Sequence, residues 1–137
     1  MNVCTVERVV DLIGDRWSLL LVGVLLGGPR RTTELATTLA PISTRTLAER
    51  LKRLEAAGVL TRRAYAEAPP RVVYELTSRG HELKPVIAAL RSVGESWEGA
   101  CELSGCRVCD VHRTNEAPVV EPEPLARRAA SVDVTLL

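Results

Sequence analysis

The stretch PISTRTLAERLKRLEAAGVL, residues 41–60, has the pattern of an amphipathic helix with a defined start and a defined end. Its leucines recur at intervals of four and three residues, so they share one helix face. They are Leu47, Leu51 and Leu54. Ser43 has a hydroxyl that accepts hydrogen bonds from the free amides of a first turn, and Gly58 suits the left-handed position after a last turn. The pattern predicts a helix with one apolar face for a core and one polar face for a partner.

The polar face of this helix carries short hydroxyl side chains at its start and basic side chains along its length. Its members are Ser43, Thr44, Arg45, Thr46, Glu49, Lys52 and Arg53. Hydroxyls suit phosphates and base edges, Arg45 can donate two hydrogen bonds to guanine, and the other basic residues lie within reach of a DNA backbone. Glu49 can accept from a cytosine amine or balance Arg45 one turn before it. A solvated helix flank has a similar composition, so the neighbouring elements decide between the two interpretations.

Those neighbours predict a helix-turn-helix followed by a hairpin. Residues 32–40, TTELATTLA, indicate a short helix buried through Leu35 and Leu39, and a brief turn joins it to the helix above. Residues 59–66 and 72–77 are rich in β-branched and aromatic side chains and flank a proline-rich loop, as in a β-hairpin. The second helix of a helix-turn-helix normally enters the major groove of DNA. This setting favours DNA recognition for the polar face.

Further helices complete the predicted domain. Apolar residues at helical spacing indicate helices over residues 6–13 and 16–26, and Thr77 caps a long helix that runs to about residue 100. Pro85 either kinks this long helix or marks its true start. The order predicts an α+β, mostly α fold: a winged helix-turn-helix domain with a two-stranded wing and a long C-terminal dimerisation helix.

An apolar seam on the first and last of these helices is longer than one chain covers by itself. Its members are Val6, Val10, Leu83, Val86, Leu90, Val93 and Trp97. The spacing of three and four residues in the last helix is typical of a coiled coil. We therefore expect a homodimer, whose two recognition helices lie about 34 Å apart and read an inverted repeat in double-stranded DNA.

Arginines border the hairpin and the short helix. Arg71, at the tip of the wing, is favoured for DNA contact over Arg62 and Arg63, because a basic wing can reach phosphates or a narrow minor groove. The alternative for all three is a charged edge that discourages strand addition. Arg30 and Arg31 precede the short helix, whose N-terminal amides suit a phosphate, so we expect them to contact DNA as well.

The composition of the 137-residue chain fits this interpretation. Its net charge is only +1, but residues 1–80 hold 12 Lys and Arg against 8 Asp and Glu, while residues 81–137 hold 6 against 9. The positive charge of the front part suits a polyanion. No segment has the length of a membrane span or the pattern of a signal peptide, so we expect a cytoplasmic protein with reduced cysteines and no membrane partner. With two histidines and no nucleophile triad, paired catalytic carboxylates or phosphate-binding glycine loop, we expect no enzyme.

Three motifs in this order resemble the HxlR family of bacterial transcription regulators: CTVER at the start, the Gly14–Trp17 segment, and the wing PPRVVYELT. The resemblance covers about residues 4–97, with Thr5 where the family usually has proline and Thr32 where it commonly has an aromatic residue. It implies a dimeric DNA-binding regulator, with repression the expected mode. It also implies redox sensing by Cys4, because some members use a cysteine at this place to detect oxidants or electrophiles.

Cys4 stands at the start of the first predicted helix, where the helix dipole favours a thiolate and Arg8 follows one turn later. The alternative is a small buried apolar side chain, which is how most free cysteines behave. Reactivity requires an exposed thiol, so the exposure of Cys4 decides between the two.

The remaining cysteines lie together after the long helix. Cys101, Cys106, Cys109 and His112 follow the spacing C-x4-C-x2-C-x2-H. Thiolates and an imidazole favour zinc, so a closed four-ligand zinc site is one interpretation. The spacing matches no familiar zinc module, and a redox dithiol, an iron–sulfur site or a tail without chemistry are the alternatives. No other cofactor is indicated.

The predicted organisation is a DNA-binding and dimerisation domain over residues 1–100, a Cys/His-rich segment over residues 101–113, and a proline-containing linker and tail over residues 114–137. The predicted function is sequence-specific transcription regulation. Control would come from redox or electrophile stress at Cys4, from the Cys/His segment, or from a small ligand at the dimer interface. Two other classes stay open: a thiol/disulfide oxidoreductase that uses the Cys-x2-Cys pair, and a winged-helix module that binds only protein.

Overall fold

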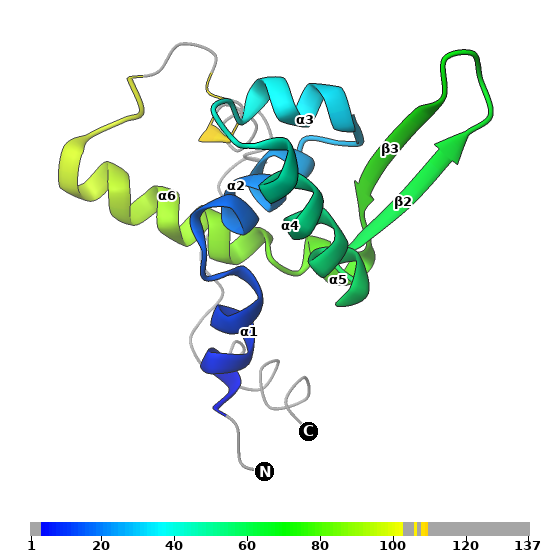
Figure 1. The fold of residues 1–137 in the computed structure, drawn as a ribbon. Helices are drawn as coiled ribbons and strands as arrows, with labels where there is room; N and C mark the ends of the chain where they lie inside the picture. Colours follow the sequence, from blue (N-terminus) through cyan, green and yellow to red (C-terminus); the bar gives the residue numbers. More distant parts are fainter. Residues whose placement is uncertain (1–3, 103–105, 107, 110–137) are drawn as a thin grey trace.

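The computed structural model describes residues 4–102, 106, 108 and 109 (Figure 1). Its elements, in chain order, are α1 (Thr5–Ile13), α2 (Arg16–Leu25), β1 (Arg30–Arg31), α3 (Thr32–Thr38), α4 (Thr44–Ala56), β2 (Leu60–Tyr65), β3 (Arg71–Leu76), α5 (Ser78–His81) and α6 (Lys84–Glu98). This order confirms the predicted winged helix-turn-helix fold, which is mostly helical. His112 and the predicted linker and tail, residues 114–137, lie outside the described residues.

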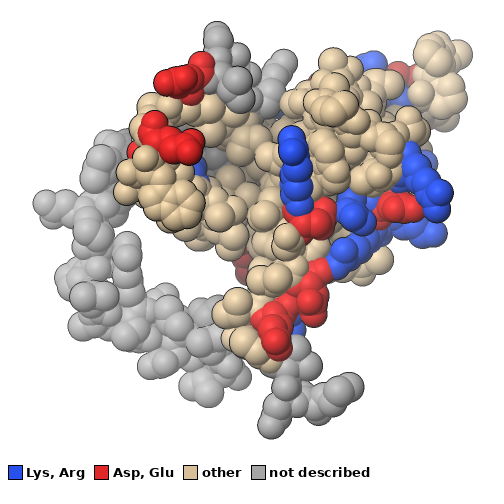
Figure 2. Space-filling model, turned by 60° about the vertical axis from the view of Figure 1, so that its left-hand side comes forward, with Lys and Arg blue, Asp and Glu red and all other residues tan. Residues whose placement is uncertain are grey.

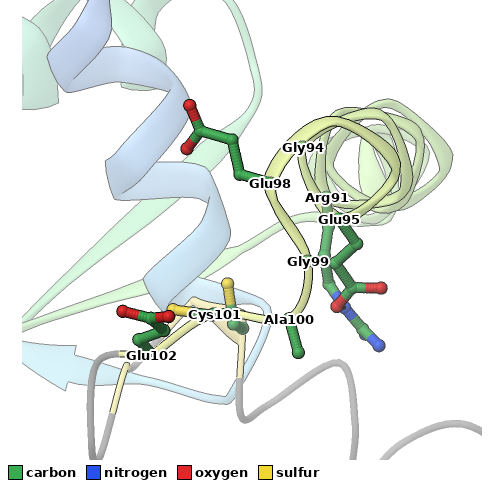
Figure 3. Close-up of a pocket in the computed structure, with 9 residues that line it drawn as sticks. Arg91, Gly94, Glu95, Glu98, Gly99, Ala100, Cys101 and Glu102 are labelled. Carbon is green, nitrogen blue, oxygen red and sulfur yellow. Dashed lines mark hydrogen bonds and ion pairs between the residues drawn. The ribbon is translucent and has the colours of Figure 1, made fainter.

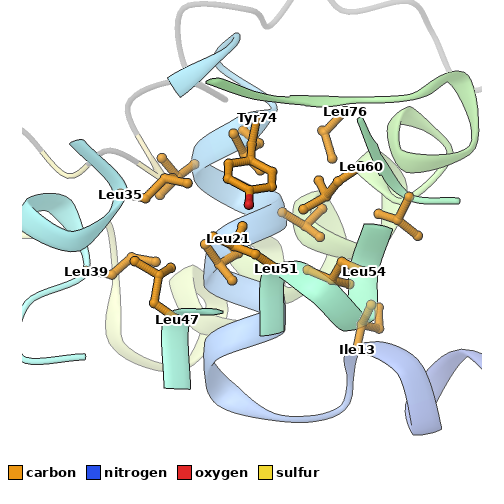
Figure 4. Close-up of a cluster of buried hydrophobic side chains, with 14 of the residues drawn as sticks. Ile13, Leu21, Leu35, Leu39, Leu47, Leu51, Leu54, Leu60, Tyr74 and Leu76 are labelled. Carbon is orange, nitrogen blue, oxygen red and sulfur yellow. The ribbon is translucent and has the colours of Figure 1, made fainter. Parts of the chain in front are cut away.

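The helix-turn-helix forms because the apolar face of α4 joins α2 and α3 in one core. Leu47, Leu51 and Leu54 are 2%, 1% and 0% exposed, so the predicted stripe is buried. They share an aliphatic cluster with Leu21 of α2 and Leu35 of α3 (Figure 4). Burial of a leucine side chain is worth about 1.5–3 kcal/mol, so this face fixes how α4 sits on the domain.

The hairpin belongs to a three-stranded antiparallel sheet, in the order β1-β3-β2. The pairing of β2 with β3 confirms the predicted wing, which projects away from the helices in Figure 1. The strand β1 has no counterpart in the sequence prediction. It forms through pairing of Arg30 with Tyr74 and of Arg31 with Val73. The wing is therefore tied back to the start of α3.

The segment after the wing forms two helices where the sequence predicts one. α5 begins at the predicted cap, since the hydroxyl of Thr77 accepts a hydrogen bond from the amide of Gly80 at 3.1 Å. α5 ends after one turn, and α6 begins at Lys84 with Pro85 in its first turn. A proline there breaks no hydrogen bond, because first-turn amides have no partner within the helix. Pro85 therefore marks the true start of the long helix.

The helices α1 and α6 lie apart from the wing. Figure 1 shows α1 and α6 extending from the helical core on the sides away from the hairpin, which leaves the wing and α4 on a different part of the surface. Among the described residues, no helix is long and apolar enough to cross a membrane.

Candidate nucleic-acid interface and cysteine sites

The start of α4 is fixed by its predicted cap. The Oγ of Ser43 accepts from the backbone amide of Thr46 at 3.1 Å and donates to the hydroxyl oxygen of Thr46 at 2.8 Å. Two of the predicted hydroxyl contacts are thus engaged within the helix. Thr44 and Arg45, between them, are exposed. The first turn therefore presents Thr44 and Arg45 outward, while Ser43 and Thr46 hold it in place.

Basic side chains continue along the exposed face of α4. Arg45, Lys52 and Arg53 are all exposed, as predicted. The side chain of Arg45 is 89% exposed, and its Nε donates to Oε1 of Glu49 at 3.1 Å. The sequence predicts two roles for Glu49, and the structure without DNA shows one of them, the balance of the Arg45 charge. An exposed pair of this kind is worth less than about 1 kcal/mol, so a DNA base can replace Glu49 as the partner of Arg45.

An ion pair that the sequence does not indicate also joins α4 to α2. The Nε of Arg50 in α4 donates to Oδ2 of Asp15 at 2.9 Å, and the same oxygen caps α2 by accepting from the amide of Ser18 at 3.0 Å. Burial opposes the charge on Asp15, but hydrogen bonds from Ser18 and the charge of Arg50 outweigh it and lower the pKa of this carboxyl. The pair joins α4 to the start of α2 across 35 residues of chain.

Arginines from two strands share one face of the sheet. Arg31 of β1 and Arg63 of β2 are both register partners of Val73, so the three side chains lie on the same side. Arg30 is half-buried and donates from Nη1 to the carbonyl of Pro29 at 2.9 Å. Figure 2 shows Lys and Arg gathered on one side of the molecule, with Asp and Glu among them. Arg63, which the sequence ranks below Arg71, is exposed, as Arg31 is, and its Nη2 lies 3.6 Å from Oε2 of Glu75.

Arg71 begins β3 and pairs with Tyr65 directly before the loop at the tip of the wing. Its guanidinium carbon lies 4.3 Å from the centroid of the Tyr65 ring, and its Nη2 lies 3.3 Å from Oε1 of Glu67. The cation–π contact with Tyr65 and the ion pair with Glu67 hold the side chain of Arg71 against the wing. Arg71 also lines a groove of about 340 Å³ together with Arg31. Contact with DNA stays a prediction for Arg71, and it requires a phosphate to replace Glu67.

The predicted dimer seam forms an apolar surface on α1 and α6. Its exposed members are Val6 (67%), Val10 (54%), Leu90 (52%), Val93 (43%) and Trp97 (81%). Leu83 and Val86 differ from them, because they are half-buried and pack against the core of the same chain. α1 and α6 border an apolar groove of about 460 Å³. Contiguous exposed apolar side chains are typical of an interaction surface.

Cys4 is the N-cap residue of α1, and its side chain is exposed. In the chain by itself Cys4 is therefore not a small buried apolar side chain. Arg8 lies one turn later, and its backbone amide donates to the Cys4 carbonyl at 3.1 Å. The thiol is open to reagents in solvent, which a sensing role requires.

The sulfur atoms of Cys101, Cys106 and Cys109 all lie within 4.8 Å of one another, and the three residues are half-buried. Burial opposes the charge on Cys106, but hydrogen bonds from the amides of Cys109 and Val108 and from the two other thiols outweigh it and lower its pKa. Burial and the neighbouring sulfurs raise the pKa of Cys109 to about 12. The structure thus brings together three of the four predicted metal ligands. His112, the fourth, lies outside the described residues.

Residues 12–102 match the sequence profile of the HxlR-like helix-turn-helix family. The chain belongs to this family. The HTH-type transcriptional regulator sll1512 of Synechocystis sp. is 43% identical over 105 residues, which cover 75% of this chain and 78% of the relative. The HTH-type transcriptional regulator YodB of Bacillus subtilis is 36% identical over 104 residues, which cover 76% of this chain and 89% of YodB.

Solved structures of HxlR-like regulators have the same fold. The redox regulator HypR in its oxidised form matches with a TM-score of 0.65 and 35% identity, over 68% of this chain and 96% of HypR. The reduced form of YodB from B. subtilis matches with a TM-score of 0.62 and 35% identity, over 74% of this chain and 97% of YodB. This HxlR-like chain is a transcriptional regulator of the helix-turn-helix type, and its relatives are regulators, not enzymes. The family match ends at residue 102, so Cys106 and Cys109 lie beyond it.

Proposed function

We propose that this HxlR-like chain is a homodimeric repressor that binds an inverted-repeat operator through α4. The observation that carries the proposal is the division of α4 into two faces, since its three leucines are buried and its basic side chains are exposed. A helix held by its apolar face and its cap presents its polar face as a rigid unit, which suits a major-groove contact. In this arrangement Thr44 and Arg45 read base edges, and Lys52 and Arg53 contact the backbone.

The arginines of the sheet extend this surface in the proposal. Arg31 and Arg63 share one sheet face, and Arg71 lines a groove together with Arg31. These side chains and Arg30 contact phosphates, which positions α4 without reading sequence. Neutralising phosphates releases counterions from DNA, so the affinity falls as the salt concentration rises.

A second copy of the chain covers the apolar surface of α1 and α6 in the proposed dimer. This surface includes Leu90 and Trp97, which are 52% and 81% exposed, and it continues into the apolar groove. Removing such surface from water favours association, and the loss of freedom of the two chains offsets part of the gain. A two-fold dimer then places its α4 helices in successive major grooves, about 34 Å apart.

Control by thiol chemistry is the regulatory part of the proposal. The similarity to HypR, a redox regulator, supports a thiol-based sensor in this chain. Cys4 is the candidate, because it is exposed and precedes Thr5 and Val6, which line the apolar groove. An electrophile that forms a bond to the Cys4 sulfur places a new group at the edge of the proposed dimer surface, and the relative position of the two α4 helices then changes.

Genome-wide mapping of bound sites, followed by binding measurements on the most enriched fragment under reducing conditions, tests this function. We expect a two-fold symmetric sequence with half-sites about one helical turn apart, and an affinity that falls steeply with salt. Enrichment of no sequence, together with an affinity that does not depend on salt, would favour a module that binds only protein.

A further inference from the structure

The cysteine cluster after α6 is a ligand set that DNA binding does not use. Its three sulfur atoms, from Cys101, Cys106 and Cys109, lie within 4.8 Å of one another. In a tetrahedral zinc site with Zn–S bonds of about 2.3 Å, thiolate sulfurs lie about 3.8 Å apart. The three sulfur atoms are thus near the separation that they have around one zinc ion, and small side-chain movements would bring them to it.

The turn that carries two of these sulfurs is seated on the core of the domain. Val108, between Cys106 and Cys109, packs against the hydrophobic core. It contacts α2 at Gly23, where an added Cβ would lie 2.8 Å from Cγ1 of Val108. The absence of a side chain on Gly23 therefore leaves the space that Val108 fills. This contact lies between the two cysteines in the chain, and their sulfurs lie beside that of Cys101.

Hydrogen bonds within the turn also suit a metal ligand. The backbone amides of Val108 and Cys109 both donate to the sulfur of Cys106. Donors of this kind, outside the metal–ligand bonds themselves, orient a ligand atom and support its negative charge. The turn thus provides both the sulfur of Cys106 and the backbone amides that support its negative charge.

A cavity of about 540 Å³ lies beside the cluster, at the end of α6 (Figure 3). Glu98 and Glu102 line it together with Cys101 and Cys109, and Arg91, which also lines it, is paired with Glu95 at 3.0 Å. Carboxylates at the edge of a cavity raise the local concentration of cations. The cavity therefore gives a cation a path from solvent to the sulfurs.

We propose that Cys101, Cys106 and Cys109 bind one zinc ion as thiolates, and that the ion fastens the segment after α6 to α2. Thiolates are soft ligands, which prefer zinc to magnesium or calcium. Three protein ligands leave one tetrahedral position, and His112, the residue that the sequence indicates for it, lies outside the described residues. Binding releases the thiol protons and stabilises the folded chain, because the unfolded chain does not hold the three sulfurs together.

Zinc content of the full-length reduced chain tests this proposal. After loading with zinc and removal of the excess by gel filtration, elemental analysis should find about one zinc per chain. Cys106→Ser and Cys109→Ser should each lose most of this zinc. Cys4→Ser is the matched control, since it removes a thiol outside the cluster, and it should keep the ion.

Two further readouts report the site without DNA. Cobalt in place of zinc should give the absorption of a tetrahedral ion with thiolate charge-transfer bands, and Cys106→Ser should lose both. Zinc should raise the melting temperature of the parent and of Cys4→Ser but not that of Cys109→Ser, with circular dichroism showing that each variant is folded. A parent chain that retains no zinc, or equal retention by Cys4→Ser and Cys106→Ser, overturns the proposal. Neither result would affect the operator proposal, which DNA binding tests separately.

Discussion

Replacing Arg50 with methionine should destabilise the domain by about 1–2 kcal/mol, because it removes the ion pair that joins α4 to the start of α2. The magnitude follows from the geometry of the pair. The Nε of Arg50 lies 2.9 Å from Oδ2 of Asp15, and the two side chains are 28% and 27% exposed. Fully exposed ion pairs contribute about 0.2–1 kcal/mol and hydrogen bonds to charged groups about 1.5–3 kcal/mol, and this half-buried pair lies between them.

Asp15 has two roles, and two substitutions separate them. Asp15→Asn keeps a side-chain oxygen for the amide of Ser18, so it removes the charge but preserves the cap of α2. Asp15→Ala removes both, and it should cost about 0.5–2 kcal/mol more than Asp15→Asn. Combining Arg50→Met with Asp15→Asn should cost less than the sum of the two, because both variants remove the attraction between the two charges, while the amide oxygen in Asp15→Asn can still accept from Arg50. The expected coupling energy is about 0.5–1.5 kcal/mol.

Urea unfolding followed by far-UV circular dichroism measures these differences. All variants need the same protein concentration, because association with a second copy also changes the apparent stability. Arg50→Met should lower the midpoint and leave the dependence of the unfolding free energy on urea unchanged. A coupling energy below about 0.3 kcal/mol would show that the pair is only a surface contact, and our explanation of how α4 is positioned would be wrong.

The parent should be more stable than Asp15→Asn above pH 3.8, the ordinary pKa of the carboxyl, and this difference should be lost as the pH falls through the lowered pKa of Asp15. A difference in unfolding free energy that stays constant in acid would contradict a stabilising charge on Asp15. Leu90→Glu should give a monomer in sedimentation velocity, because its charge would be buried between subunits. Ser92→Glu, about 200° around α6 from Leu90, should remain dimeric, and dimers in both variants would place the interface elsewhere. Cys4→Ser should bind the operator but ignore a quinone, and mass spectrometry of the partly modified parent should find the first adduct at Cys4. First labelling of another cysteine would remove Cys4 from sensing.

The local features of α4 could be predicted because each depends on residues within two helical turns. The cap at Ser43 and the stripe through Leu47 and Leu51 are visible in the sequence, and both are present. Gly58 has a φ of 77°, the left-handed conformation predicted for it. A short-range pattern contains all the information that such features need.

Features that join distant segments could not be predicted in this way. Nothing near Arg50 in the sequence indicates its ion pair, because its partner Asp15 lies 35 residues away and an arginine on the polar side of a helix is ordinary. Two successive arginines have no strand pattern, and β1 exists only because Arg31 pairs with Val73 of β3. The spacing of the cysteines indicated that they meet, but the contact that seats their turn, on Gly23, is visible only in three dimensions.

The operator affinity of Arg45→Ala tests most directly whether the exposed face of α4 reads DNA sequence. The Arg45 side chain is 89% exposed and its ion pair with Glu49 lies on the surface, so its loss should leave the fold unchanged. We expect Arg45→Ala to lose about 1–3 kcal/mol of operator binding and to discriminate less at one base pair in each half-site. Lys84→Ala removes an exposed positive charge at the start of α6, outside α4 and the wing, and should bind nearly as the parent does. Equal operator affinities for the parent, Arg45→Ala and Lys84→Ala, with unchanged circular dichroism, would contradict recognition by α4.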